Sequence, residues 1–332
     1  MSVLSLTAAR VKNRLYLREE GGSLREQQQE QVHASPARAH VSVMMKEVLA
    51  NLDIKDGEQV VDGTAGEAGH SVAILESNPH VQLLALDADP LAVETARERL
   101  SKFGDRAEVV ESNFGNLEKV LHHKGIKTID KALFDLGWNS GQLASGRGFS
   151  FLVDEPLNMS YGTKSASGFT AAQALNEWDE ETLANVFYGY GEERFSRRIA
   201  KAIVERREIQ PIETTLELVE IIRDSTPSLY HRARLHFATR TFQGLRMAVN
   251  DELGMINMGV AAAWEHLSPG GRIAVITFHS IEDRTVKRLF ADFVKGGGKL
   301  IVKKPLVPER AEISENPRAR SAKLRVIEKP QH

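Results

Sequence analysis

Three glycines at every third position follow an apolar run that ends in an acid, in residues 60–71, Val-Val-Asp-Gly-Thr-Ala-Gly-Glu-Ala-Gly-His-Ser. The pattern predicts a strand, a tight turn and a helix that opens at Val72. Gly63, Gly66 and Gly69 let the backbone turn and lie against a ligand, because they carry no Cβ and adopt positive φ at little cost. The first N–H groups of the helix would face the same ligand. Such a turn binds many nucleotide-like ligands, so alone it identifies none of them.

A second carboxylate site follows one helix later. The apolar run 81–86 ends in Asp87-Ala88-Asp89. An acid at the tip of the second strand of a βαβ unit is placed to accept hydrogen bonds from ribose hydroxyls, and Asp87 is the predicted ribose ligand. Asp89 is either a further ligand or the cap of the helix that starts at Pro90.

The third candidate is the tip of the fourth strand, residues 134–140, Phe-Asp-Leu-Gly-Trp-Asn-Ser. Methyl transfer to a planar amine needs a carboxylate and an aromatic face, because the amine lone pair is delocalised and the base must be held in line. Asp135 is predicted to accept the amine proton or to bind the cofactor. Trp138, Phe149 or Phe151 would stack on the base. Alternatively, Trp138 and Phe151 are core residues beneath a loop.

The fifth strand ends in Phe278-His279-Ser280-Ile281-Glu282-Asp283. Ser280 with Asp283 resembles a capping box at the start of a helix. His279 either faces the pocket as a hydrogen-bonding or acid–base group or is a structural histidine. The other histidines lack metal-ligand spacing and the chain has no cysteine, so no metal site is predicted.

These tips must be brought together by a sheet. The predicted strands are residues 59–62, 82–87, 107–111, 131–136 and 272–278, with helical patterns between the early ones. The alternation predicts an α/β fold with a doubly wound, mostly parallel, Rossmann-like sheet. Ligands of such sheets bind at the carboxyl ends of the strands.

Helical patterns dominate between the fourth and fifth strands. They cover residues 171–175, 180–188, 194–207, 214–224 and 250–267. The prediction is a core of residues 40–138 and 247–332 that is interrupted by a helical substrate-recognition domain, residues 139–246, with the last helix rejoining the core. Residues 299–306 and 323–328 could pair as an edge hairpin.

Composition excludes several classes of protein. The chain has 332 residues, a net charge of −2 and no cysteine, so disulfide frameworks and a global attraction to polyanions are not expected. No apolar run reaches the roughly 20 residues that span a bilayer, and a soluble, cytoplasmic protein is expected. Residues 1–39 read as a weakly ordered extension; an organelle-targeting peptide is the alternative.

Three basic stretches could contact phosphates. The first, on one predicted helix, comprises Arg194, Arg197, Arg198, Lys201, Arg206 and Arg207, diluted by glutamates. The second, residues 225–250, contains no acid, and its basic residues are His231, Arg232, Arg234, His236, Arg240 and Arg246. The third comprises Arg318, Arg320, Lys323 and Arg325. The second stretch is the strongest candidate for phosphate contacts, whereas a solvated face is the alternative for the first.

Residues 40–329 resemble the bacterial small-subunit rRNA methyltransferase H (MraW) family. The segments that match, in order, are Asp62-Gly63-Thr64, Gly69-His70-Ser71, Leu86-Asp87, Asp135-Leu136-Gly137, Gln142-Leu143, Arg147-Gly148-Phe149-Ser150-Phe151, Tyr190-Gly191-Glu192-Glu193-Arg194-Phe195, Ala238-Thr239-Arg240-Thr241-Phe242-Gln243, Phe278-His279-Ser280, Glu282-Asp283-Arg284 and Glu315-Asn316-Pro317-Arg318-Ala319-Arg320-Ser321. The resemblance implies S-adenosylmethionine as cofactor and the N(4) amine of a decoding-centre cytidine in small-subunit rRNA as methyl acceptor. It leaves a monomer and a homodimer open.

The resemblance and the residues together give a set of site predictions. The cofactor contacts are Gly66, Ala68, Gly69, His70, Asp87, Phe114, Asp135 and Gln142. The substrate contacts are Trp138, Phe149, Phe151, Arg240, His279 and Arg318, and Asp135 is the catalytic residue.

The chain departs from the family pattern at three places that bear on the site. Ala68-Gly69 replaces a glycine pair, so a methyl group is expected to crowd the cofactor. Trp138-Asn139-Ser140-Gly141 and Asn158-Met159-Ser160-Tyr161-Gly162 replace Val-Ser-Ser-Pro and Asp-Met-Arg-Met-Asp. Stacking by Trp138 and Tyr161 could replace the lost polar contacts.

Three alternatives to this function stay open. They are a different nucleic-acid or protein substrate, a cofactor-binding ribosome assembly factor without turnover, and a nicotinamide-dependent oxidoreductase. The spacing of the glycines argues against the last, because it is not G-x-G-x-x-G.

Overall fold

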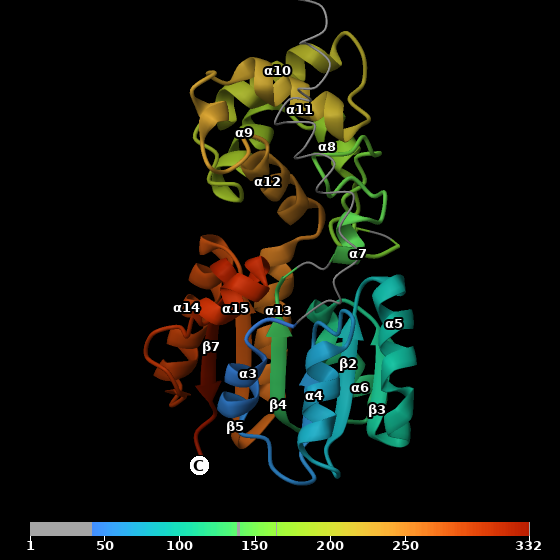
Figure 1. Ribbon diagram of the computed structural model, residues 1–332, viewed down its shortest axis with the longest axis vertical. Coiled ribbons are helices and arrows are strands. Elements are labelled where there is room, and N and C mark those ends of the chain that lie inside the picture. The colour runs from blue at the N-terminus through green and yellow to red at the C-terminus, as the bar shows by residue number, and fades with distance from the viewer. Residues whose placement is uncertain (1–41, 138–139, 164, 332) are drawn as a thin grey trace, which may run out of the picture. The chain divides into compact units, whose positions relative to one another are not determined.

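The computed structural model describes residues 42–137, 140–163 and 165–331, so the predicted extension and Trp138 lie outside the described residues. One seven-stranded sheet organises the described part of the chain (Figure 1). Its strands are β1 (Gln59–Asp62), β2 (Gln82–Asp87), β3 (Ala107–Glu111), β4 (Ile129–Asp135), β5 (Leu267–Thr277), β6 (Lys299–Leu300) and β7 (Lys323–Glu328).

The strand order is β3-β2-β1-β4-β5-β7-β6, and the first five strands are parallel. From β1 the chain passes to β2 on one side, and β4 lies on the other. This reversal is the switch point at which doubly wound sheets bind ligands. The predicted Rossmann-like α/β fold is confirmed.

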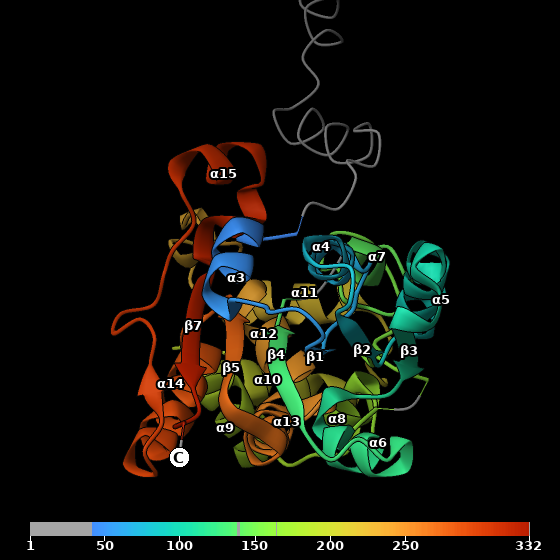
Figure 2. The ribbon, with the colours of Figure 1, turned by 90° about the horizontal axis from the view of Figure 1, so that it is seen from below.

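Helices cover both faces of the sheet (Figure 2). On one face, α3 (Met45–Leu52), α4 (Gly69–Ser77) and α5 (Pro90–Leu100) bury apolar residues in one core cluster. On the other, α6 (Leu117–Lys124), α13 (Glu252–His266) and α14 (Ser280–Lys295) form a second cluster. The last helix of the predicted insertion, α13, therefore does rejoin the core.

A third core cluster contains only residues 149–249. The helices of this lobe are α8 (Ala171–Glu177), α9 (Glu180–Gly189), α10 (Ser196–Arg207), α11 (Thr215–Ser225) and α12 (Thr239–Val249), and α7 (Ser140–Leu143) precedes them. Capping boxes fix the starts of α8 and α11, with Thr170 paired to Gln173 and Thr214 to Glu217. The domain bounds proposed from the sequence stay a prediction.

Short elements complete the described chain. They are the 3₁₀ turns η1 (Ser101–Arg106), η2 (Phe114–Asn116), η3 (Tyr230–Arg232) and η4 (Pro317–Ser321), and the helix α15 (Arg310–Glu315). No helix among the described residues is both long and apolar enough to cross a membrane.

Several predicted boundaries differ from the structure by a few residues. Helix α4 begins at Gly69 instead of Val72, because Ala68 takes the left-handed conformation that ends the turn. Strand β5 starts five residues before the predicted 272, where Leu267 pairs with Ile129. The tail segments do pair, but β6 has only two residues and β7 lies between β5 and β6, so β7 is not at the edge.

Gly63 allows β1 to pack closely against β4. A Cβ at this buried position would lie 2.5 Å from Cε1 of Phe134, a fully buried ring. We expect Gly63→Ala to lower the free energy of unfolding by about 1 to 3 kcal/mol, because the ring or the backbone must move. Urea denaturation with an unchanged m-value measures this change.

The matched control is Gly189→Ala near the end of α9, where a Cβ meets no atom within 4 Å. Its unfolding free energy should stay unchanged or rise by up to about 1 kcal/mol, because alanine favours helix. Equal effects of both substitutions would contradict the packing role of Gly63.

Candidate active site

The turn between β1 and α4 forms one wall of the site. Of its three glycines only Gly66 has positive φ, at 51°, and its missing Cβ leaves open space. Gly69 instead makes room inside the protein, since a Cβ there would lie 2.0 Å from the Ser42 hydroxyl. The predicted tight turn is confirmed, but close internal packing explains Gly63 and Gly69.

Ala68 also has positive φ, at 60°. Its side chain is fully buried within the core cluster beneath α3 and α4. The methyl group therefore packs within the protein core, and the expected crowding of the cofactor stays a prediction. The backbone at this position costs about 1 kcal/mol or more relative to glycine.

Asp87 lies at the tip of β2 beside this turn. Its carboxylate accepts hydrogen bonds from the backbone N–H groups of Gly66, at 2.8 Å, and Asp89, at 2.9 Å. Burial raises the pKa of Asp87 to about 6, although both hydrogen bonds oppose the shift. The carboxylate is thus held rigidly and keeps lone pairs for a further donor such as a ribose hydroxyl.

Asp89 forms a cap, one of the two alternatives drawn from the sequence. Its side chain accepts a hydrogen bond from Leu91 N at the start of α5, with Pro90 in the first turn. The other carboxylate oxygen pairs with the guanidinium of Arg147, a residue of the lobe sequence.

Asp135 lies at the tip of β4, across the switch point from Asp87. Its backbone N–H donates to Thr64 Oγ1 at 2.6 Å, which ties the strand tip to the β1 turn. Its side chain is 16% exposed, and Oδ2 lies 3.7 Å from His70 Nδ1. Burial raises the pKa of Asp135 to about 6, and the nearby imidazole opposes this shift.

The tautomer of His70 follows from its other contact. Nε2 lies 3.0 Å from the carbonyl oxygen of Val43, which can only accept, so Nε2 carries the hydrogen. In the neutral imidazole, Nδ1 then presents its lone pair to Asp135. The 3.7 Å between Nδ1 and Oδ2 is longer than a hydrogen bond, so His70 acts on Asp135 through electrostatics.

His279 is the N-cap of α14, and its capping partner is Glu282. Glu282 N donates to His279 Nδ1 at 3.4 Å, and the Glu282 carboxylate accepts from Phe278 N and His279 N. The predicted pair of Ser280 and Asp283 is wrong, because the helix begins at Ser280 and its third residue is Glu282. Ser280 Oγ instead donates to Glu192 of the lobe at 2.8 Å.

Among the described residues, one cluster of side chains has the spacing of metal ligands. Donor atoms of Glu252, His279 and Glu282 lie within 4.8 Å of one another. Arg246 already pairs with Glu252 through two hydrogen bonds, of 2.7 and 3.1 Å. The guanidinium supplies the positive charge that two buried carboxylates require. The absence of a metal stays a prediction.

The predicted stacking residues lie in the lobe. Phe149 is 8% exposed and stacks on Tyr161, with ring centroids 5.5 Å apart. Phe151 is partly buried and stacks on His236 at 4.6 Å. The Tyr161 hydroxyl donates to Glu252 at 2.9 Å, so both its ring and its polar end have partners within the protein.

The remaining predicted contacts surround these groups. Phe114 meets Phe134 edge-on at 5.6 Å, and both side chains lie close to Gly63. Gln142 is buried within α7. Arg240 donates to the carbonyl oxygen of Glu192, the residue that contacts Ser280. Arg318 is exposed and interacts electrostatically with Glu67 of the β1–α4 turn.

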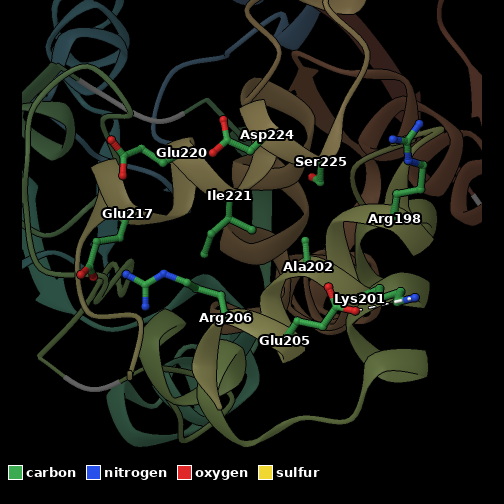
Figure 3. A pocket seen from close by; sticks show the side chains of 10 residues that line it. All are labelled: Arg198, Lys201, Ala202, Glu205, Arg206, Glu217, Glu220, Ile221, Asp224 and Ser225. Carbon is green, nitrogen blue, oxygen red and sulfur yellow. Dashed lines mark ion pairs between the residues drawn. The ribbon is translucent and has the colours of Figure 1, made fainter. Parts of the chain in front are cut away.

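The basic stretches have different surroundings in the folded protein. In the second stretch Arg246 is enclosed in its ion pair, whereas Arg232 and Arg234 are exposed. On α10, Arg198, Lys201 and Arg206 of the first stretch line a groove of about 630 Å³ against α11 (Figure 3). Acids of both helices, including Glu205 and Glu220, share that groove, which fits a solvated face.

The fold and this arrangement of strand tips define the chain as a Rossmann-like, S-adenosylmethionine-dependent methyltransferase. The family model described as the MraW methylase family matches residues 37–330. The chain therefore belongs to the MraW methylase family, and the resemblance seen in the sequence is confirmed.

Several known proteins are similar to this chain. The ribosomal RNA small subunit methyltransferase H of Brevibacillus brevis is 45% identical over 308 residues, 87% of this chain and 98% of that protein. The protein of the same name from Geobacter sulfurreducens is 46% identical over 309 residues, 88% of this chain and 99% of its own length. A solved rRNA methylase from Streptococcus thermophilus has a TM-score of 0.42 at 13% identity, covering 88% of this chain and 100% of that one.

The residues of the site fit the cofactor of this class. Asp87 suits a ribose diol, the open Gly66 allows close approach of a ligand, and the first N–H groups of α4 suit a carboxylate. Sequence analysis did not identify Thr64, Arg147 or Glu252 as parts of the site. Thr64 and Arg147 stand inside matched motifs, which is the signal that could have found them, whereas Glu252 carries none.

The raised pKa of Asp135 predicts how the free energy of unfolding depends on pH. Its folded value of about 6 exceeds the reference value of 3.8, so the carboxyl favours the folded state below pH 3.8 and loses that advantage as the pH rises through 6. We expect Asp135→Asn to raise the free energy of unfolding at pH 8 by about 1 to 3 kcal/mol. The gain should shrink towards pH 4.

Urea denaturation at pH 4, 6 and 8 measures this difference. The exposed Asp105→Asn is the control, and its difference from the parent protein should vary little with pH. A constant or negative difference for Asp135→Asn would show that the folded site does not disfavour the ionised carboxyl.

Proposed function

We propose that the protein transfers a methyl group from S-adenosylmethionine to the N(4) amine of a decoding-centre cytidine in small-subunit rRNA. The observation that carries this proposal is the pairing of Asp135 with His70 at the β4 tip, next to the Asp87 carboxylate and the glycine turn. Relatives named ribosomal RNA small subunit methyltransferase H, at 45 and 46% identity, support the substrate class.

An aromatic amine is a weak nucleophile, and the pair of Asp135 and His70 compensates for this weakness. S-adenosylmethionine supplies an electrophilic methyl group when it is bound. The Asp135 carboxylate accepts a hydrogen bond from the amine and directs its nitrogen lone pair at the methyl carbon. The amine would gain the methyl group as the sulfur–carbon bond of the cofactor breaks and S-adenosylhomocysteine leaves, and Asp135 would take the proton that the amine loses. The proton would then leave to water from Asp135, whose side chain is 16% exposed.

The cofactor would lie across the switch point. In this proposal Asp87 binds the ribose, and Gly66, Ala68, Gly69 and His70 present backbone at the turn. Phe114, Asp135 and Gln142 complete the contacts implied by the family. The RNA would meet aromatic and basic side chains of the lobe, of the start of α14 and of the tail. They are Phe149, Phe151, Arg240, His279 and Arg318. We place this activity in the cytoplasm, with the small subunit as partner.

The direct test uses labelled S-adenosylmethionine with small subunits that lack the modification, and naked rRNA and duplex DNA in parallel. We expect N(4)-methylcytidine, identified by mass spectrometry, on the assembled subunit only. A different modified nucleoside would change the assigned substrate. Cofactor binding without transfer to any of the three would favour another substrate or a docking role.

Asp135 should be essential for methyl transfer but contribute little to cofactor binding. We expect Asp135→Asn and Asp135→Ala to lower kcat by at least about 100-fold, because the amine loses its proton acceptor. S-adenosylhomocysteine binding, measured by calorimetry, should weaken only a few-fold. For the parent enzyme kcat/KM should fall below pH 6, where Asp135 becomes protonated. Unchanged turnover would remove Asp135 from the mechanism.

The exposed arginines of the acid-poor stretch should act through phosphates. We expect Arg232→Gln and Arg234→Gln each to reduce the slope of log affinity for the subunit against log salt by about one. The exposed Arg288→Gln on α14 is the matched control, with the slope unchanged. Equal slopes in all variants would place the RNA on another surface.

A further inference from the structure

Arg147 lies between two parts of the active site. The proposed mechanism requires that these two parts are correctly positioned relative to each other. One is the Asp87–Asp89 turn at the tip of β2. The other is the rim segment, residues 145–161, which carries Phe149 and Tyr161. No step of the proposed reaction uses Arg147, yet its guanidinium is only 21% exposed and is surrounded by acceptors.

The first set of contacts joins Arg147 to the cofactor side. Its Nη2 pairs with a carboxylate oxygen of Asp89, a side chain that is 4% exposed. The backbone N–H of Asp89 donates to Asp87, which also accepts from Gly66 N. Two hydrogen bonds and one ion pair therefore connect the glycine turn with Arg147.

The second set joins Arg147 to the rim segment. Nη1 donates to the carbonyl oxygens of Ser160, at 3.2 Å, and Tyr161, at 2.7 Å, and Nε donates to Ser145 Oγ at 2.9 Å. The guanidinium carbon also lies 5.5 Å from the centre of the Phe149 ring. One planar cation thus fastens both ends of the rim segment and contacts its buried aromatic ring.

The rim segment is in turn fastened to the junction of α12 and α13. Tyr161 N donates to the Asn250 side chain at 2.9 Å, and the Tyr161 hydroxyl donates to Glu252 at 2.9 Å. Asp251, between them, has positive φ, at 45°, where the chain passes from α12 to α13. Displacement of the rim segment would therefore disturb this junction as well.

We propose that Arg147 is a positioning residue that transmits cofactor binding at Asp87 to the rim segment that receives the target base. A cofactor bound to Asp87 would fix the position of the 87–89 turn. The Asp89 carboxylate would then fix the Arg147 guanidinium, which in turn would fix both ends of the rim segment. The inference rests on the proposed function and assigns an order to it: the cofactor-loaded enzyme binds the RNA more tightly than the free enzyme.

Three variants separate this role from simple packing. Arg147→Gln removes the charge and the fork of donors, whereas Arg147→Lys keeps the charge but cannot serve the same acceptors. Asp89→Asn removes the charge while keeping a good helix cap. The exposed Arg97→Gln on α5, whose residue donates to the Val109 carbonyl, is the matched control.

The first readout needs no RNA. Hydrogen exchange of the rim segment is measured in each protein with and without S-adenosylhomocysteine. We expect the ligand to slow exchange in the parent protein and in Arg97→Gln, and to have no such effect in Arg147→Gln or Asp89→Asn. Ligand affinity should change less than about threefold. Equal ligand protection of the rim segment in all four proteins would overturn the proposal.

The second readout is methylation of the subunit. Arg147→Gln and Asp89→Asn should raise KM for the subunit by about 10-fold or more, a usual size for coupling between sites, and the double variant should be no worse than either single one. Arg147→Lys should recover little. Fully additive effects would contradict a shared path. Absence of methylation by the parent protein would refute the proposed function alone, since the exchange result stands independently.

Discussion

Three carboxylates, those of Asp62, Asp87 and Asp135, are held out of water around one turn at the carboxyl edge of the sheet. Each is compensated locally. Ser71 and Thr64 N donate to Asp62, backbone N–H groups donate to Asp87, and an imidazole faces Asp135. Burial of like charges is costly unless donors are fixed in place. The sharp β1–α4 turn, the close packing of β1 on β4 and the early start of α4 all serve to fix those donors.

This arrangement explains why the site is both reactive and strained. A carboxyl whose pKa is close to 6 can gain and lose a proton near neutral pH, which general acid–base chemistry requires. The same desolvation opposes folding when the group is ionised. Ala68 adds a left-handed backbone at the same turn. The extensive core on both faces of the sheet offsets these local costs, as is usual where function and stability conflict.

The lobe contacts the sheet domain through a small number of ion pairs and polar contacts. Arg147 contacts Asp89, Arg246 contacts Glu252, and Glu192 contacts both Ser280 and Arg284. Each contact reaches a residue at or near a strand tip or helix start beside the site. The polar junction thus sets the position of the aromatic rim relative to the carboxylates, while the apolar core of the lobe supports the rim from within.

The sequence by itself determined the sheet, the turn and the carboxylates at its edge, because short apolar runs that end in an acid mark strand tips through local chemistry. Asp87 and Asp135 and the confirmed family followed from such short motifs. Only the tertiary structure decided which neighbour each group meets. It made His279 rather than Ser280 the cap of α14, because the helix start is set by where β5 ends. It enclosed Arg246 with Glu252, joined Arg147 to Asp89 and placed Phe149 beneath Tyr161. These contacts join residues of the lobe to one another or to the sheet domain, and sequence spacing holds no information about contacts that depend on long-range packing.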